Sequence, residues 1–213
     1  IAAMYVDQQR GSAFTSHSYS LGAPLARHDI QIKLAGRQAE CTLNGAYLVD
    51  DSQHVDYHTQ IEHAVPACSS LQLYKGVIQG RARAVFNGRV TIQPAAQQSN
   101  ARQLNKNLLL AEKGEVDSKP ELQIYADDVI CTHGATVGQL DTQSLFYLQS
   151  RGFSKKDAQA WLAYGFVSEL LERISDPALR RFIQQPVITR LEQLVGGESN
   201  LQALLPAQSG VPS

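Results

Sequence analysis

The chain has 213 residues, of which 43% are hydrophobic, so it is long enough to form one or two domains around a real core. Its 19 basic and 20 acidic residues nearly balance, which gives no indication of a nucleic-acid partner or of an anionic membrane surface. We find neither a secretory leader nor an apolar run of the roughly 18–20 residues that a transmembrane helix needs. Because the sequence begins with Ile1 and not with an initiator methionine, we interpret the chain as part of a longer protein.

Alternating apolar and polar residues from about Asp29 to Ile130 predict a series of half-buried β-strands. The alternation is clearest in residues 30–34 and 55–62, and turn-forming pairs such as Asn44-Gly45 and Asn87-Gly88 punctuate it. These two pairs lie 43 residues apart after similar lead-ins, "AECTLNGAYL" and "ARAVFNGRVTI". The spacing fits two turns of a solenoid with about 20–25 residues per turn. A sandwich or barrel of hairpins is the alternative, because Asn-Gly is also the strongest hairpin signal.

The hydrophobic period changes to 3.6 after Asp141, which predicts helices. Asp141 can cap a first helix that stops at Gly152, and Ser154 with Asp157 forms a start of the capping-box type for a second. The apolar stripe predicted for this second helix is Ala158, Trp161, Leu162, Gly165, Phe166, Leu170 and Ile174.

Asp176-Pro177 marks the start of a third helix, which Pro186 is expected to break or kink. The residues after this helix are expected to form a flexible tail. The predicted organisation is a β domain over residues 1–133, a helical domain over 134–195 and a tail over 196–213.

A cysteine and a histidine end the last predicted strand, in the stretch "CTHGATVGQLD". Cys131 and His133 stand at i and i+2, so on a strand they point to the same face, with Cα atoms roughly 6–7 Å apart. Thiolate and imidazole suit iron–sulfur clusters, zinc or copper, but two ligands do not close a site. Gly134 and Gly138 leave room for another chain to approach. An inert buried thiol beside a solvated histidine, and a Cys–His nucleophile pair, are the alternatives.

Other polar groups are better explained by structure than by chemistry. Cys41 and Cys68 are expected to be small buried side chains, and His63 a core histidine. The alternate residues His54, Asp56, His58, Gln60 and Glu62 are interpreted as a polar outer strand face, and Lys75, Arg81, Arg83 and Arg89 as a second one. No phosphate-binding loop is present, so no nucleotide is expected to bind this chain.

Three long blocks carry a resemblance: "QHVDYHTQIEHAVPACSSLQLYKGVIQGRARAVFNGRV", "EVDSKPELQIYADDVICTHGATVGQLD" and "LFYLQSRGFSKKDAQAWLAYGF". They resemble the SufB/SufD family of iron–sulfur cluster assembly proteins, and the SufD members more than the SufB members. The similarity runs from about Arg27 to Phe166. It implies a right-handed parallel β-helix followed by a helical domain.

The resemblance also implies partners and a role. The expected assembly is a cytosolic complex in which SufB pairs with this chain through the β-helix, with a SufD homodimer as the alternative. The SufC ATPase would dock on the helical domain, through residues such as Leu145, Phe146, Leu148, Trp161, Phe166 and Leu170. At the SufB interface, iron would bind or a transient cluster would form with His133 as a ligand and Cys131 as an auxiliary ligand. The chain would then be a scaffold and not an enzyme.

Two other functions stay open from the residues alone. A β-helix enzyme acting on polysaccharide would need clustered carboxylates in an open groove, and the only candidate stripe, Asp56 to Glu62, lacks an aromatic platform. A purely structural interaction module would leave Cys131 and His133 without a chemical role.

Overall fold

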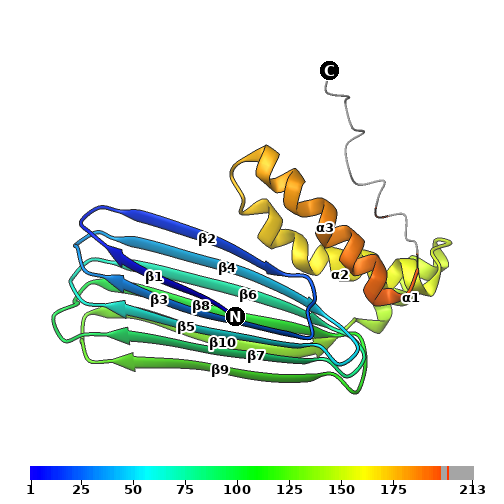
Figure 1. Cartoon of the computed structure of the whole chain (residues 1–213), viewed down its shortest axis with the longest axis horizontal. Helices are drawn as coiled ribbons and strands as arrows, with labels where there is room; N and C mark the ends of the chain where they lie inside the picture. Colours follow the sequence, from blue (N-terminus) through cyan, green and yellow to red (C-terminus); the bar gives the residue numbers. More distant parts are fainter. Residues whose placement is uncertain (198–200, 202–213) are drawn as a thin grey trace. The chain divides into compact units, whose positions relative to one another are not determined.

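The strands build a parallel β-helix of two sheets (Figure 1). The computed structural model describes residues 1–197 and 201, and within them ten strands alternate between the sheets. Sheet 1 contains, in spatial order, β1 (Ala2–Gln8), β3 (Leu25–Leu34), β5 (His54–His63), β7 (Arg83–Ile92) and β9 (Glu115–Ile124). Sheet 2 contains β10 (Val129–Gln139), β8 (Ser99–Leu109), β6 (Ser69–Ile78), β4 (Glu40–Val49) and β2 (Ala13–Ser20). Each turn of the chain adds one strand to each sheet, which confirms the predicted β-helix.

The turn of the β-helix is longer than the sequence spacing predicted. Leu25, His54 and Arg83 lie opposite one another on successive strands of sheet 1, so a central turn takes 29 residues. The predicted turn of about 20–25 residues is therefore wrong. Asn44-Gly45 lies inside β4 and Asn87-Gly88 inside β7, in different sheets, so their spacing is one and a half turns. Neither pair forms a hairpin turn, and the hairpin alternative is also wrong.

Glycines in sheet 2 make room for tyrosine rings. Gly45 lies opposite Tyr74, and Gly76 lies opposite Tyr47, on the neighbouring strands β4 and β6. A Cβ atom built on either glycine would overlap the ring opposite it. Both tyrosines are fully buried, so each ring occupies the space that a side chain on the facing glycine would need. Close packing between strands, and not a turn, therefore explains the glycine of the Asn44-Gly45 pair.

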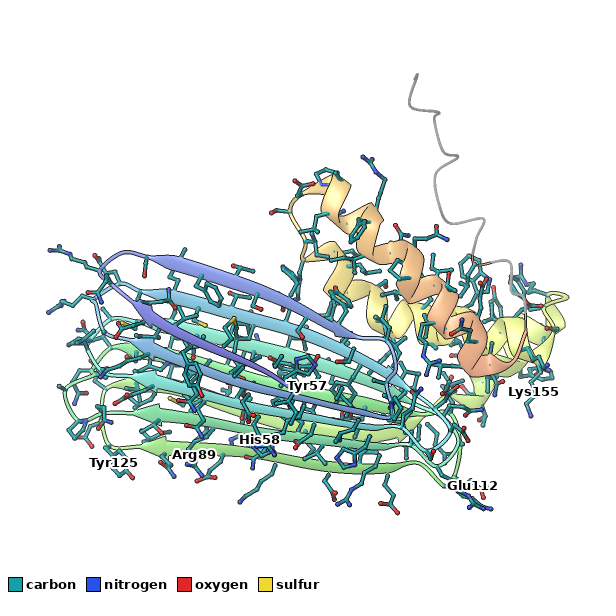
Figure 2. All side chains as sticks on the ribbon, in the orientation of Figure 1. Tyr57, His58, Arg89, Glu112, Tyr125 and Lys155 are labelled. Atoms are coloured by element: carbon teal, nitrogen blue, oxygen red, sulfur yellow. The ribbon has the colours of Figure 1, made fainter. Side chains whose placement is uncertain are left out.

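An aromatic cluster continues this packing across the interior. Tyr57 stacks on His28 with ring centroids 4.4 Å apart, and its ring also contacts Tyr47 and Tyr74. Tyr74 in turn contacts Phe86 at 4.9 Å. Tyr57 and its neighbour in sequence, His58, lie on opposite faces of β5, because Tyr57 is fully buried whereas the side chain of His58 is 31% exposed (Figure 2).

The interior is also polar in places, which the alternation did not indicate. The Tyr47 hydroxyl donates to Asn107 Oδ1 at 2.6 Å and accepts from Asn105 Nδ2 at 2.9 Å. Asn105 Oδ1 accepts from Asn107 Nδ2 and from the Ser118 hydroxyl, each at 2.7 Å. This network joins both sheets, because Ser118 belongs to β9 and the others to sheet 2.

Strands begin earlier in the chain than predicted, because β1 and β2 precede Asp29. These two strands end their sheets in the described residues, so each has one strand neighbour. Many of their side chains are exposed, which explains why their apolar alternation is weak.

The C-terminal unit contains α1 (Thr142–Ser150), α2 (Lys155–Glu172) and α3 (Pro177–Val195). The predicted caps are confirmed: the side chains of Asp141, Ser154 and Asp176 accept hydrogen bonds from backbone N–H groups in the first turns. Pro186 lies inside α3 and does not end it, so the predicted break is wrong. None of the helices in the described part of the chain is long and apolar enough to span a membrane.

The buried face of α2 is rotated relative to the predicted stripe. Gly165 is exposed, and Trp161 and Phe166 are only half-buried. The buried residues of the helix are Ala158, Ala160, Ala163, Val167, Leu170 and Leu171. Small alanines, which a search for large apolar residues overlooks, thus form part of the packed face.

The chain divides into two compact units, Ile1–Gly138 and Gln139–Ser213. The boundary predicted after residue 133 falls inside β10, because that strand continues to Gln139. Most of the tail predicted over 196–213 lies outside the described residues. Of the part that is described, Leu201 is buried.

The glycine–tyrosine packing yields a stability prediction. Gly45→Ala should lower the free energy of unfolding by about 1–3 kcal/mol, because its methyl group would overlap the buried Tyr74 ring. Gly138→Ala is the matched control, since a Cβ there meets no atom within 4 Å. Urea unfolding of the three proteins checks this, and equal stability of Gly45→Ala and Gly138→Ala would contradict the packing.

Candidate functional site

Cys131 and His133 lie on β10, the last strand of the β-helix. Cys131 is half-buried and packs against the hydrophobic core, whereas His133 is exposed. Burial raises the pKa of the Cys131 thiol, and a hydrogen bond from the backbone of Ala101 partly offsets that rise. The thiol is therefore mainly protonated at neutral pH, and a metal ion would have to displace its proton to bind.

The last turn is open on one side. Among the described strands, β9 has only β7 as a neighbour and β10 has only β8, so each leaves a row of backbone groups unpaired. Four large apolar side chains in or between these strands are exposed, namely Ile124, Tyr125, Ile130 and Val137. An edge with this composition is suited to pairing with another protein chain.

The donor set at this edge is incomplete. No group of three or more His, Cys, Asp or Glu residues that could hold a metal ion occurs among the described residues. Thiolate and imidazole are nevertheless the donor types that iron–sulfur clusters accept. The pair therefore fits part of an iron or cluster site whose remaining ligands come from elsewhere.

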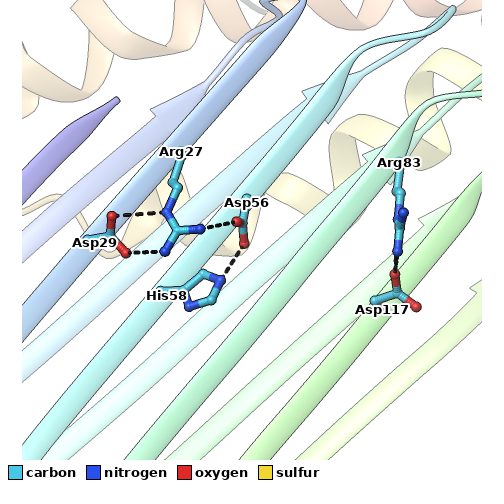
Figure 3. Close-up of polar contacts among 6 residues, drawn as sticks. All are labelled: Arg27, Asp29, Asp56, His58, Arg83 and Asp117. Carbon is cyan, nitrogen blue, oxygen red and sulfur yellow. Dashed lines mark hydrogen bonds and ion pairs between the residues drawn. The ribbon is translucent and has the colours of Figure 1, made fainter.

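The second predicted candidate, on the outer face of β5, is an ion-pair network (Figure 3). Arg27 binds both carboxylate oxygens of Asp29 at 3.0 Å and reaches Asp56 at 3.2 Å. The other oxygen of Asp56 lies 2.8 Å from His58 Nε2. The interpretation of this stripe as an outer polar face is confirmed, with its charges paired across β3 and β5.

Three further predictions concern buried groups. His63 is fully buried and its Nε2 lies 2.8 Å from the Ser70 hydroxyl, so it is a core histidine; burial lowers its pKa to about 4. Cys41 and Cys68 are buried as predicted. Lys75 is only 4% exposed, so the prediction that it belongs to a solvated basic face is wrong. Arg83 and Arg89 do lie on the surface, paired with acidic residues of β9.

The polysaccharide alternative needs an open groove, and sheet 1 has one of about 520 Å³. It is lined by Tyr5 and by amide side chains such as Gln31 and Gln60, with Asp7 and Glu62 as its carboxylates. Each carboxylate accepts a hydrogen bond from a glutamine amide. Glycoside hydrolysis needs two carboxyl groups that reach the scissile bond, so a groove whose two carboxylates are engaged by amide side chains does not favour that chemistry.

The predicted docking residues of the helical unit differ in accessibility. Phe146 is 73% exposed, and Leu145, Leu148, Trp161 and Phe166 are half-buried. Leu170 is fully buried within the helical packing, so its assignment to a docking surface is withdrawn.

Sequence reasoning overlooked two docking candidates in α3. Leu179 is 45% exposed and Phe182 is 77% exposed, one helical turn apart. Apolar residues at helical spacing are equally typical of a core face, and the sequence carries no signal that distinguishes an apolar stripe facing a partner from one facing the core.

Comparison with known proteins identifies the family of this chain. The family model described as "SUF system FeS cluster assembly, SufBD core domain" matches residues 1–166. The chain belongs to the SufBD family. This SufBD chain is 39% identical over 182 residues to the iron–sulfur cluster assembly protein SufD of Escherichia coli, covering 85% of the chain and 42% of that protein.

Two further relatives support the same assignment. A SufBD family protein of Synechocystis sp. is 37% identical, with 89% of this chain and 42% of the relative covered. The chloroplastic protein ABCI7 of Arabidopsis thaliana is 35% identical, with coverages of 83% and 37%. The chain thus spans about two fifths of the length of these relatives.

The different environments of the cysteines predict their reactivity. Cys131 should react with iodoacetamide in the native protein, and its rate should rise with pH because the raised pKa leaves little thiolate at neutral pH. Cys41, whose pKa burial raises to about 12, should react only after unfolding. Mass spectrometry of peptides labelled at pH 7 and pH 9 measures both rates. Equal native labelling of Cys41 and Cys131 would contradict the described burial.

Proposed function

We propose that this chain is the cluster-bearing and partner-binding part of a non-catalytic scaffold for iron–sulfur cluster assembly. The observation that carries the proposal is the incomplete pair of soft donors, Cys131 and His133, on the open last strand of a β-helix in a SufBD chain. The substrate is iron or a nascent cluster, held for a time and then passed on.

Incomplete ligation suits a scaffold of this kind. A closed site of four protein ligands would hold a metal permanently, whereas two ligands leave positions that a partner can fill and later vacate. We infer that the partner is SufB, and that it pairs with β9 and β10 through their free edges and the apolar side chains beside them. A SufD homodimer, through the same edges, is the competing assembly.

The helical unit is assigned to the SufC ATPase. Phe146, Leu179 and Phe182 supply exposed apolar contact area on α1 and α3, which a partner would bury. The purely structural alternative uses the same docking surface on the helices and the same free edges of β9 and β10. It differs only in leaving Cys131 and His133 without a role, so tests of those two residues discriminate between the two functions.

Substitution of His133 tests the ligand role. His133→Ala should reduce the iron and sulfide retained by the complex after anaerobic reconstitution, without unfolding the β-helix, because His133 is exposed. His54→Ala, a histidine on the outer face of β5, is the control and should retain the wild-type cluster content. Iron analysis and visible absorption measure the outcome. Wild-type cluster content in His133→Ala would support the purely structural alternative.

Substitution of Phe182 tests the docking surface. Phe182→Asp should weaken capture of SufC in a pull-down, because it places a charge in the centre of an apolar contact, while circular dichroism stays unchanged since the side chain is 77% exposed. Tyr5→Asp is the control, as Tyr5 is 70% exposed on β1. Undiminished capture by Phe182→Asp would argue against docking through α3.

A further inference from the structure

A glutamine deep in the β-helix has no hydrogen-bond partner. Gln103 is 0% exposed, and neither its amide oxygen nor its amide nitrogen is hydrogen-bonded within the described residues. A buried polar group left unpaired costs about 1–3 kcal/mol, so its presence calls for a physical reason.

Gln103 belongs to a polar layer that crosses the interior. It lies on β8 opposite Gln72 of β6, which is also fully buried. Gln72 Oε1 accepts a hydrogen bond from the Thr59 hydroxyl at 2.7 Å. The amide tip of Gln103 reaches the opposite sheet, where a Cβ on Gly88 would overlap its Nε2 atom. Gln103 therefore fills a defined place in the interior, with its hydrogen-bonding groups available.

The next strand of sheet 2 after β8 is β10, which carries the candidate ligands. Two contacts relate these strands. The backbone of Ala101 hydrogen-bonds the Cys131 sulfur, and a Cβ on Gly134 would lie 3.2 Å from Leu104 Cδ2. In both contacts, the residue of β10 has a number 30 higher than its partner on β8, which gives the register of the two strands. Because side chains two positions on share a face, this pairing puts His133 next to Gln103.

A histidine that binds a metal with one ring nitrogen usually donates the N–H of the other to a carbonyl or carboxylate oxygen. That second bond fixes the ring orientation and the tautomer. His133 is exposed and Gln103 offers an unused acceptor on the neighbouring strand. We propose that Gln103 is a positioning residue for His133, whose imidazole N–H its amide oxygen accepts when the other ring nitrogen binds iron or a nascent cluster.

This inference rests on the proposed ligand role of His133 and goes beyond it. A buried water between Gln72 and Gln103 is the competing explanation, since it would satisfy both amides without any part played by His133. The two explanations differ in what the loss of Gln103 does to metal binding.

Cobalt(II) is the probe, because its thiolate charge-transfer absorption reports binding without any assembly assay. We would titrate the purified complex of this chain with SufB, the partner proposed to complete the site, anaerobically with cobalt and fit the Kd. Gln103→Leu should bind cobalt about 10–100-fold more weakly than wild type, as loss of a residue that orients a metal-binding histidine typically does. Gln103→Glu, which keeps an oxygen acceptor, should retain binding.

Two controls separate positioning from general packing. Gln72→Leu removes an equally buried amide of the same layer on β6, which is not a neighbour of β10, and should leave the Kd unchanged. In a His133→Ala background, Gln103→Leu should have no further effect on the Kd, because the residue it orients is gone. Thermal unfolding of each variant confirms that the proteins compared are folded.

The outcomes separate this inference from the proposed function. Wild-type affinity in Gln103→Leu, or an equal loss in Gln72→Leu or in the His133→Ala background, would overturn the positioning role alone. Cobalt binding that does not depend on His133, or no cobalt binding by the wild-type complex, would overturn both the positioning role and the ligand role.

Discussion

The packing of tyrosine rings against glycines between β4 and β6 is the constraint on which the rest of the β-helix depends. Gly45 faces Tyr74 and Gly76 faces Tyr47, so the tyrosine ring of each strand fills the space that a side chain on the facing glycine would need. A slip of one residue would turn every side chain of a strand to the opposite face, and a slip of two would place Tyr47 opposite Tyr74. The packing therefore holds the register of sheet 2, and successive strands carry that register to β8 and β10.

Register matters because the candidate site is built from neighbouring strands and not from one continuous motif. Cys131 and His133 supply two donors from β10, and Gln103, with its unpaired amide, belongs to the neighbouring strand β8. In the described residues, β10 is the last strand of sheet 2, and one of its edges has no strand neighbour. A solenoid is well suited to this arrangement, because each turn is stabilised by its neighbours while the terminal turn stays available to a partner.

Part of this architecture follows from the sequence. Alternation predicts the central strands, and the side chains of Asp141, Ser154 and Asp176 predict where the helices begin, because both signals are local. The length of a turn is not local: Asn44-Gly45 resembles a hairpin turn until the ring facing Gly45 is known. The burial of Leu170 and the exposure of Phe182 are not local either, because both are apolar at helical spacing and only packing distinguishes them. Cys131 and His133 are recognisable as a donor pair, but the unpaired amide of Gln103 becomes visible only in the folded interior.

The most direct test is pulsed electron paramagnetic resonance on the reconstituted complex after one-electron reduction, with only this chain labelled with ¹⁵N-histidine. If His133 is a ligand, a ¹⁵N coupling to the cluster should appear in the wild-type complex and disappear in His133→Ala. A cluster that forms without any ¹⁵N coupling would mean that this chain contributes no histidine, and that its last strand serves only to bind a partner.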